Sequence, residues 1–530
     1  MPVRVIFHML WVATALRVLV PSFADPDLWG HVLFGSILLG GELPAVNGFS
    51  YTAADHAWVN HEVLAEISMA AIYNAGGAGG LIAFKVGLGL ATLFLVWRAA
   101  FHRTHDHVAS GIATTVVALV MTPGFMIRPQ IFTLLFLAAT LAELAKVDYR
   151  PRGMAWGLPL LFVVWINTHG GVLAGLGLAG IGVIAALAGR WRGGERRLRD
   201  VATSGLFLAT LALALLVNPW GVGLLDFLAT DVTPQVAITE WAPVSLTDAS
   251  FPVFKLVLTL VAAYCLLGTN VRLPEAIIAI AAGTVAIMHQ RHIPLFAIAA
   301  TPIVAAAVAE WWQARARPSV RRLAVGACAM LAVAQLGIAM SAGIAARGQI
   351  FVNPWHYPVQ AVRFLVQNDI AGNVALPFHW GEYAIWSLPP GSRVAVDGRF
   401  TTAYPQNLLS SVWHFMSGEP EWETLLTDYP TDIVISDRNH APATLLRDHE
   451  EWEYVYSDPV SVVFIRHIDS QAETIARFRD GSLRYDNSPL DTSFPGAFQG
   501  NTGTDIPFLP SADCRRAADG APSAPRPDFC

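Results

Sequence analysis

The sequence predicts an α-helical polytopic membrane protein with about eleven transmembrane helices and a C-terminal extracytoplasmic α/β domain. Of the 530 residues, 54% are hydrophobic and only 14% are charged, and the mean hydropathy is +0.47. Soluble domains carry about 25% charged residues, so this composition indicates an integral membrane protein. The formal net charge is −6 and there is no long basic run, so we expect no nucleic-acid partner.

Apolar stretches that approach the ~20 residues needed to cross a bilayer recur along the first two thirds of the chain. In chain order they are 5–23, 79–97, 108–126, 130–146, 155–168, 170–189, 201–217, 251–269, 273–289, 292–312 and 323–346. The segment 61–76 is also apolar, but Glu62 and Glu66 interrupt it. We expect this segment to be a helix lying at the membrane interface.

The distribution of Lys and Arg among the short loops predicts the topology, because these residues mark the cytoplasmic side. The clusters are Arg98 and Arg103; Lys146, Arg150 and Arg152; Arg190 to Arg199; and Arg315 to Arg322. With Arg4 inside, eleven spans place every cluster in the cytoplasm and the chain from about residue 347 outside. A cleaved signal peptide ending before Asp25 is the alternative for the N-terminal stretch, but His8 and Arg17 interrupt that stretch.

The composition changes after the last apolar stretch. The segments "GNVALPF", "RVAVDGR", "DIVISDR", "WEYVYSD" and "VSVVFIR" read as strands, with helical stretches such as 356–368 and 404–416 between them. We therefore predict a transmembrane domain over 1–346 and an α/β domain over 347–468. The tail 469–530 is rich in Pro, Gly, Ser and Asp and is expected to be largely disordered.

The four cysteines show no metal-ligand spacing. Cys265 and Cys328 lie in apolar stretches, where we expect them to be core residues. Cys514 and Cys530 lie in the tail, and a disulfide between them is an open alternative.

Given this topology, nearly every unusual polar residue falls on the outer face. They are Asp25, Asp27, His31, Asn60, His61, Glu62, Glu66, Arg128, Gln130, Asn167, His169, Glu240, Trp241, His289, Arg291 and His292. The cytoplasmic loops carry little beyond Arg and Lys. Ionisable groups at membrane depth are costly and usually face a bundle interior or a watery cavity. Acids gathered with Arg and His at one face indicate a site for an anionic, partly apolar ligand.

A lipid phosphate fits this description. Arg128, Arg291 or His292 could pair with phosphate oxygens, an arginine in bidentate fashion. A carboxylate close by could act as general base towards a hydroxyl.

Each motif also has a purely structural interpretation. Asp25 and Asp27 could cap a helix that starts near Leu28, since acids favour helix N-termini. His61 and Glu62 could only hold water, "NTHGG" could be a tight helix-hairpin turn, and "NPWG" could end a helix and anchor Trp220 at the interface.

Nine short motifs, which are "DPDLWGH", "WVNHEVLAE", "RPQIF", "WINTHGG", "NPWG", "EWAP", "RHIPLF", "FHWGEYAIW" and "VAVDGRF", are distributed over the chain from about residue 24 to 405. This set resembles a largely uncharacterised bacterial family of multi-pass membrane proteins described as GT-C-like. The paired acids after the first helix, the bundle and the external α/β domain are similar to the GT-C class of membrane glycosyltransferases. That class includes oligosaccharyltransferase catalytic subunits, protein O-mannosyltransferases and aminoarabinose transferases.

The resemblance implies an inverting glycosyltransferase of the bacterial inner membrane, with its C-terminal domain in the periplasm. Its donor would be a polyprenyl-phosphate-linked sugar, and its acceptor an envelope glycan, lipid or protein. An acid of the first outer loop, 24–60, would be the base, and by position this is Asp25 or Asp27. Beyond membrane lipids no other partner is implied. The metal question stays open, because two nearby acids could hold Mg²⁺ or Mn²⁺ whereas monophosphate donors in this class typically do without.

The chain departs from the better-known members of the class in its soluble domain. Residues 380–383 read "WGEY" and not the "WWD" of oligosaccharyltransferases, which puts peptide-sequon recognition in doubt, and no β-trefoil domain is evident. Asp397 and Arg399 follow a predicted strand, and Trp380 and Glu382 start a predicted helix. Loops after strands often bind ligands, so these residues could contact an acceptor glycan. The alternative is a structural turn with an aromatic residue packed against the membrane domain.

Two other classes of function remain alternatives. A transporter or flippase of lipid-linked precursors predicts polar residues through the bilayer depth and often internal repeats. Charges within the predicted spans are scarce and no repeat is visible. A non-catalytic GT-C-like assembly protein would keep the fold without the reaction.

Overall fold

The computed structural model describes residues 3–150, 157–194, 197–230, 238–315, 318–486 and 488–496. The chain divides into two compact units. The first, which we call the helical unit, consists of Met1–Leu28 and Val59–Phe351. The second, which we call the sheet unit, consists of Trp29–Trp58 and Val352–Cys530.

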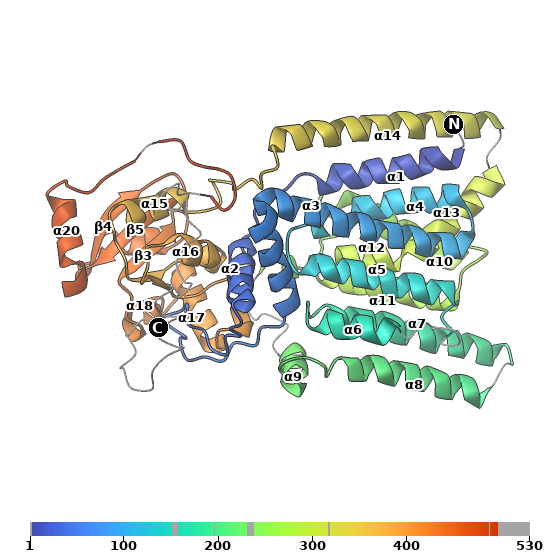
Figure 1. Ribbon diagram of the computed structural model, residues 1–530, viewed down its shortest axis with the longest axis horizontal. Helices are drawn as coiled ribbons and strands as arrows, with labels where there is room; N and C mark the ends of the chain where they lie inside the picture. Colours follow the sequence, from blue (N-terminus) through green and yellow to red (C-terminus); the bar gives the residue numbers. More distant parts are fainter. Residues whose placement is uncertain are drawn as a thin grey trace. The chain divides into compact units, whose positions relative to one another are not determined.

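The helical unit is a bundle of helices joined by short connections (Figure 1). Its α-helices are α1 (Val3–Leu19), α3 (Val63–Thr104), α4 (His107–Val120), α5 (Gln130–Lys146), α6 (Gly157–Ile166), α7 (Val172–Arg192), α8 (Leu198–Ala214), α9 (Val222–Thr230), α10 (Pro252–Leu267), α11 (Leu273–Met288), α12 (Ile293–Ala299), α13 (Thr301–Arg315) and α14 (Pro318–Ala346). Short 3₁₀ helices occur at η1 (Thr122–Gly124), η2 (Thr239–Trp241) and η3 (Gln290–His292). Each predicted apolar stretch coincides with a helix, and 292–312 comprises α12 and α13.

Some of these helices are long and apolar enough to cross a bilayer alone. Among the described helices these are α3, α7 and α14, and α12 with α13 would make a fourth span bent by 54°. Several others are apolar but have only 10–17 residues. With the composition, this makes the chain a membrane protein, while the number of eleven crossings remains a prediction.

The helix α3 is broken near its first third. Gly77 has φ 58° and ψ −150°, which interrupts the helical backbone. Residues with a Cβ rarely adopt this conformation, so glycine allows the change of direction here. The helix expected over 61–76 is thus confirmed as the first segment of α3, which begins at Val63, and its interfacial position stays a prediction.

A buried ion pair joins α3 to α11. Arg103 Nε donates to Glu275 at 2.8 Å, and the two side chains are 3% and 2% exposed. Nearby, Arg272 pairs with Asp148 at 2.9 Å, but these side chains are 40% and 51% exposed. Both pairs have similar geometry and differ mainly in their access to solvent.

We expect Arg103→Met to lower the free energy of unfolding by about 3–5 kcal/mol, because it leaves the Glu275 carboxylate buried without its partner. The matched variant Arg272→Met removes an exposed pair and should cost only about 0–1 kcal/mol. Thermal unfolding in detergent measures both. Equal shifts of the midpoint temperature in the two variants would contradict the conclusion that the buried pair contributes more to stability than the exposed one.

The sheet unit contains five described strands: β1 (Asn373–Ala375), β2 (Arg393–Val394), β3 (Ile433–Asp437), β4 (Trp452–Ser457) and β5 (Ser461–Arg466). Their order is β2-β1-β3-β5-β4. β1 pairs in parallel with β2 and β3, whereas β5 is antiparallel to β3 and β4. Each strand lies in one of the five segments that the sequence predicts, because these segments are rich in Val, Ile and aromatic residues.

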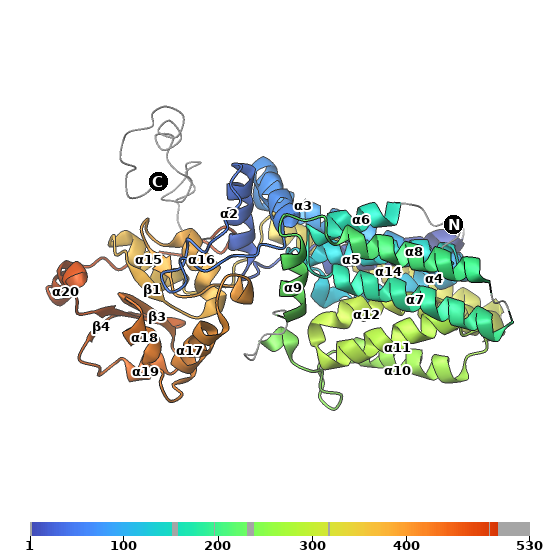
Figure 2. The same cartoon turned by 90° about the horizontal axis from the view of Figure 1, so that it is seen from below.

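Helices cover both sides of this sheet. They are α15 (Val359–Gln367), α16 (Gly381–Ser387), α17 (Gln406–Ser417), α18 (Thr424–Asp428), α19 (Pro442–Leu445) and α20 (Ala472–Arg479), with short 3₁₀ helices η4 (Phe378–Trp380), η5 (Phe400–Thr402) and η6 (Asp469–Gln471). Figure 2 shows α15 and α16 on one side of the strands and α18 and α19 on the other. The predicted α/β class is therefore confirmed for this unit.

The predicted domain boundaries differ from the structure in the first outer loop. The sequence assigned 24–60 to the membrane domain, but Trp29–Trp58 belongs to the sheet unit. This segment contains α2 (Leu28–Leu39), and Ser50 then forms a parallel bridge with Val394 of β2. β2 is an edge strand, so the backbone N–H and C=O groups on its outer side have no partner among the described strands, and the loop residues around Ser50 form hydrogen bonds with these groups.

The predicted disorder from residue 469 is wrong for the described part of the tail. After η6 and α20, Val352 N–H donates to Thr492 O at 2.7 Å, and Arg363 Nη1 donates to Ser488 O at 2.9 Å. The composition of the tail could not predict these contacts, because their acceptors are backbone carbonyl oxygens, which every residue type has. Cys514 and Cys530 lie outside the described residues, while Cys265 and Cys328 are half-buried free thiols.

Candidate active site

Three carboxylates surround one guanidinium in the helical unit. Arg128, from the segment between η1 and α5, donates from Nε to Asp25 Oδ1 at 2.9 Å. Its Nη1 pairs with Glu240 of η2 at 2.5 Å, and its Nη2 pairs with Asp27. We call Asp25, Asp27, Arg128 and Glu240 the Arg128 cluster. It brings together three segments that the sequence predicted on one face.

The two aspartates lie in the turn that precedes α2. Asp25 Oδ1 accepts the backbone N–H of Asp27 at 3.2 Å, and Asp25 O accepts that of Leu28 at 3.1 Å. Neither aspartate side chain accepts an N–H of the described helix α2, so the side-chain capping expected as the structural alternative is not observed, and the two carboxylates instead form ion pairs with Arg128. Asp25 is only 2% exposed, whereas the side chain of Asp27 is 17% exposed.

Burial and charge give these acids different proton affinities. Burial raises the pKa of Asp25 to about 7, and the carboxylate of Asp27 adds to this, against the opposing effect of Arg128. Burial also acts to raise the pKa of Glu240, but Arg128 and Arg291 outweigh it and the pKa is lowered. Asp25 is thus the acid of the cluster placed to exchange a proton near neutral pH.

A second cation lies beside the cluster. The guanidinium of Arg291, in η3, stands 4.5 Å from the centre of the Trp241 ring. His289 Nδ1 donates to Trp241 O at 2.8 Å, and the ring of His292 meets that of Trp241 edge-on. Among the described residues Arg291 forms no hydrogen bond or ion pair, so its donors remain available to an anionic ligand.

A second polar group forms around the start of α3. Asn60 Nδ2 donates to Glu66 Oε2 at 2.6 Å, and Asn60 Oδ1 accepts the N–H of Glu62 at 2.9 Å. Nε2 of His61 and Nε2 of His169 each lie 3.7 Å from Glu62 Oε1. Carboxylate oxygens of Glu62 and Glu66 come within 4.8 Å of each other, and such a pair suits a hard divalent cation.

The tautomer of His169 follows from its neighbours. Gly171 N–H donates to His169 Nδ1 at 2.9 Å, so Nδ1 carries no proton and Nε2 carries one towards Glu62. Thr133 Oγ1 lies 2.9 Å from the same Nδ1 and accepts from Trp165 Nε1 at 2.9 Å. Burial lowers the pKa of His169 to about 3, so the ring is a neutral donor at physiological pH.

The predicted turn at "NTHGG" is present between α6 and α7, and Gly171 permits close packing there, because a Cβ at this position would come within 2.4 Å of Thr133 Oγ1. Thr133 therefore orients His169, a role that the sequence analysis missed. In the sequence, Thr133 is only a hydroxyl side chain within an apolar helix, and many threonines share that feature, so the sequence did not indicate this role.

Two predicted site residues have simpler surroundings. Asn167 Nδ2 donates to Val163 O at 2.8 Å and to Val217 O at 2.7 Å, which ties α6 to the end of α8. Gln130 is half-buried at the start of α5 and makes no side-chain hydrogen bond with the described residues. Trp220 Nε1 donates to Asn60 O at 2.7 Å, so it anchors the second polar group.

The remaining predicted site residues belong to the sheet unit and are buried. Trp380 is 0% exposed, Glu382 3%, Asp397 0%, Arg399 8%, and His31 of α2 7%. Trp380 Nε1 donates to His356 O at 2.7 Å, and a ring without exposed surface cannot stack on a sugar. Trp380 thus packs within the sheet unit, whereas the acceptor contacts expected of Glu382, Asp397 and Arg399 remain a prediction.

Neither protein-family models nor curated proteins match this chain. Solved structures do match it. The arabinofuranosyltransferase AftD from Mycobacteria has a TM-score of 0.51 at 13% identity, over 88% of this chain and 40% of that one. ArnT from Cupriavidus metallidurans bound to undecaprenyl phosphate has 0.48 at 13% identity, over 88% and 98% of the two chains. Apo ArnT has 0.49 at 12% identity, over 87% and 96%.

This chain thus spans about two fifths of AftD, and the likeness concerns the fold. The fold is GT-C-like, as the motifs led us to expect.

Proposed function

We propose that this chain is a membrane glycosyltransferase that moves a sugar from a polyprenyl-phosphate-linked donor to an envelope glycan, lipid or protein. One observation carries the proposal. Asp25 is a buried carboxyl with a pKa of about 7, held by Arg128 at the end of a bundle with a GT-C-like fold. A general base works best when its pKa lies near the operating pH. AftD, which shares the fold, is an arabinofuranosyltransferase, and this supports the class.

In the proposed reaction, the acceptor hydroxyl loses its proton to the Asp25 carboxylate. The acceptor oxygen attacks the anomeric carbon from the face opposite the phosphate. The bond between that carbon and the phosphate oxygen breaks, and polyprenyl phosphate leaves with the electron pair. The configuration at the anomeric carbon is therefore inverted.

The two arginines have different roles in this proposal. Arg128 has Nε, Nη1 and Nη2 engaged with carboxylates, so it orients Asp25 and Asp27 and does not bind phosphate. Arg291 lacks such partners among the described residues and is the cation for the departing phosphate, with His292 as the next residue of η3. The sequence had indicated Arg128 and Arg291 equally as partners of the phosphate, and this proposal assigns the phosphate to Arg291 alone.

Other parts of the proposal follow from the topology. The distribution of Lys and Arg supports a site on the outer face of the bacterial inner membrane, with the sheet unit in the periplasm. His61, Glu62 and His169 belong to the helical unit, as does the Arg128 cluster, and we include them in the proposed donor site. If a Mg²⁺ or Mn²⁺ ion takes part, Glu62 and Glu66 are its proposed ligands.

Mass spectrometry of polyprenyl-linked sugars tests the function in cells that lack the protein. One lipid-linked sugar should accumulate, and complementation with the wild type should clear it. An unchanged pool would contradict the enzyme proposal. Transport of an unaltered lipid-linked sugar into vesicles by the purified protein would favour a flippase instead.

The rate of transfer should depend on pH through Asp25. The base must be ionised to accept a proton, and its ionised fraction falls as the pH drops below the pKa. We expect kcat to decline below pH about 7 and to fall about tenfold per unit well below it. Rates measured between pH 5 and 9 give the midpoint. A midpoint near 4, as for a solvated carboxyl, would contradict the assignment.

A further inference from the structure

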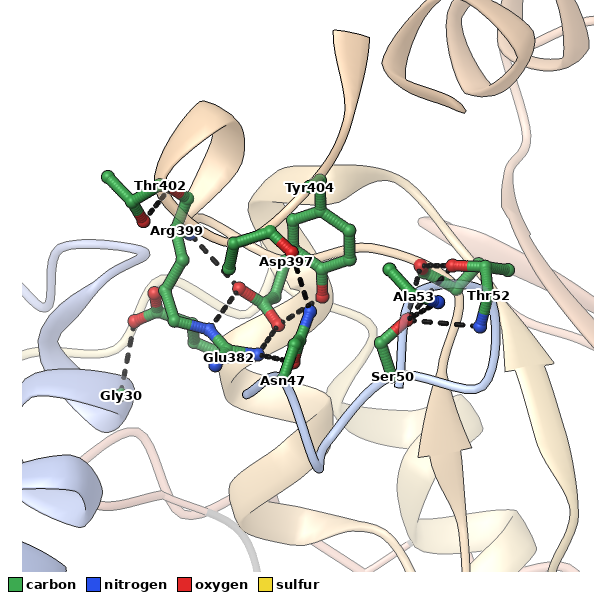
Figure 3. A network of polar contacts seen from close by, with 12 residues as sticks. Gly30, Asn47, Ser50, Thr52, Ala53, Glu382, Asp397, Arg399, Thr402 and Tyr404 are labelled. Atoms are coloured by element: carbon green, nitrogen blue, oxygen red, sulfur yellow. Dashed lines mark hydrogen bonds and ion pairs between the residues drawn. The ribbon is translucent and has the colours of Figure 1, made fainter. Parts of the chain in front are cut away.

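The segment Trp29–Trp58 of the first outer loop belongs to the sheet unit and packs around Arg399. Figure 3 shows its guanidinium between the Asp397 carboxylate and the Asn47 amide. Nε donates to Asp397 Oδ1 at 2.9 Å, and Nη2 donates to Asp397 Oδ2 at 2.6 Å and to Asn47 Oδ1 at 2.5 Å. Tyr404 donates its hydroxyl to the same carboxylate at 2.5 Å. Asp397 thus fixes the arginine, and the arginine holds the loop.

Aromatic rings from the loop enclose the same guanidinium. Its carbon lies 4.8 Å from the ring centre of Phe34, 5.2 Å from that of Phe49 and 4.5 Å from that of Trp58. Phe34 belongs to α2 and is 1% exposed. Planar guanidinium groups stack on rings and bind carboxylates through a fork, and a lysine does neither equally well.

Further contacts hold the beginning of α2. Gly30 N–H donates to Glu382 Oε2 at 3.1 Å, and a Cβ at this position would come within 2.1 Å of that oxygen. Trp29 is 0% exposed and donates from Nε1 to Pro495 O at 2.6 Å. The rings of Trp29 and Tyr383 are 5.1 Å apart. The first turns of α2 are therefore held from several directions within the sheet unit.

The same helix starts at the two aspartates. Leu28 is the first residue of α2, and its N–H donates to Asp25 O at 3.1 Å. We propose that Arg399 is a positioning residue for the Asp25–Asp27 turn, which it controls by holding α2 through Phe34 and the following loop. The effect of Arg399 on catalysis rests on the proposed function, whereas its effect on the conformation of the Asp25–Asp27 turn does not.

Hydrogen exchange of the full-length protein in detergent, followed by mass spectrometry, tests this proposal. Arg399→Lys should make the amides of residues 24–34 exchange at least about tenfold faster, because a charge-assisted fork and its ring contacts are lost. Arg466→Lys is the matched control. Arg466 also pairs with a carboxylate, Glu451 at 2.8 Å, and stacks on a ring, Trp452 at 5.8 Å, but it forms no hydrogen bond, ion pair or ring contact with the described residues of the loop.

Unchanged exchange over 24–34 in Arg399→Lys would overturn the proposal, even if the variant unfolds at a lower temperature. If that variant does not fold, Phe34→Leu removes one ring of the enclosure and should give a smaller increase in the same segment. No increase in Phe34→Leu would then overturn it.

Kinetics separate this inference from the proposed function. Arg399→Lys should lower kcat for sugar transfer while KM for the lipid-linked donor stays the same. Faster exchange with an unaltered kcat would overturn the positioning role. A wild type without any transfer would refute the proposed function, and the exchange result would still decide whether Arg399 holds the turn.

Discussion

Replacing Asp25 with asparagine should lower the rate of sugar transfer by about 10²–10⁴-fold, the usual contribution of a general base. Asparagine has nearly the same shape but cannot accept a proton from the acceptor hydroxyl at neutral pH. Asp25 is the stronger candidate of the two aspartates because it is 2% exposed and its pKa is about 7. Release of polyprenyl phosphate by the purified enzyme measures the rate.

The control for this variant is Asp55→Asn. Asp55 is an exposed acid of the same outer loop and makes no hydrogen bond or ion pair with the described residues. Its replacement should leave the rate unchanged. If Asp27→Asn abolished transfer while Asp25→Asn kept most of it, the base would be Asp27.

Replacing Arg128 with glutamine should impair both stability and activity. The variant leaves the carboxylates of Asp25, Asp27 and Glu240 without their shared cation, which should cost about 3–5 kcal/mol of unfolding free energy. Arg128 lowers the pKa of Asp25, so its removal should raise that pKa above about 7 and move the acidic limb of the rate to higher pH. Thermal unfolding and kcat, each measured as a function of pH, follow the two effects.

The sign of the stability effect can be checked separately. The pKa of Asp25 in the folded protein lies above its ordinary value of 3.8, so folding favours the protonated form. The loss of stability in Arg128→Gln should therefore be largest above pH 7, where Asp25 is ionised, and should shrink as the pH falls. Arg128→Lys keeps the charge but not the fork, and should recover part of both properties. Equal losses at pH 5 and pH 8 would contradict this account.

The positions of the secondary-structure elements were readable from the sequence. Each predicted apolar stretch coincides with one helix or, over 292–312, with two, and each of the five predicted strand segments contains a strand. Helices and strands could be predicted in this way because the length of an apolar stretch and its content of β-branched residues are properties of one segment and do not depend on the rest of the chain. The gathering of polar residues was also predictable, since residues of loops on one side of a bundle must share that side.

Which residues meet was decided by the tertiary structure. Arg128 and Glu240 are 112 positions apart, and Asn47 and Arg399 are 352 apart. A sequence pattern can place such residues on a face, but a single guanidinium offers five donors, and only packing selects the carboxylates that take them. For the same reason the segment Trp29–Trp58 belongs to the sheet unit, where the buried Arg399 contacts Asn47 of this segment and Asp397 pairs with Arg399.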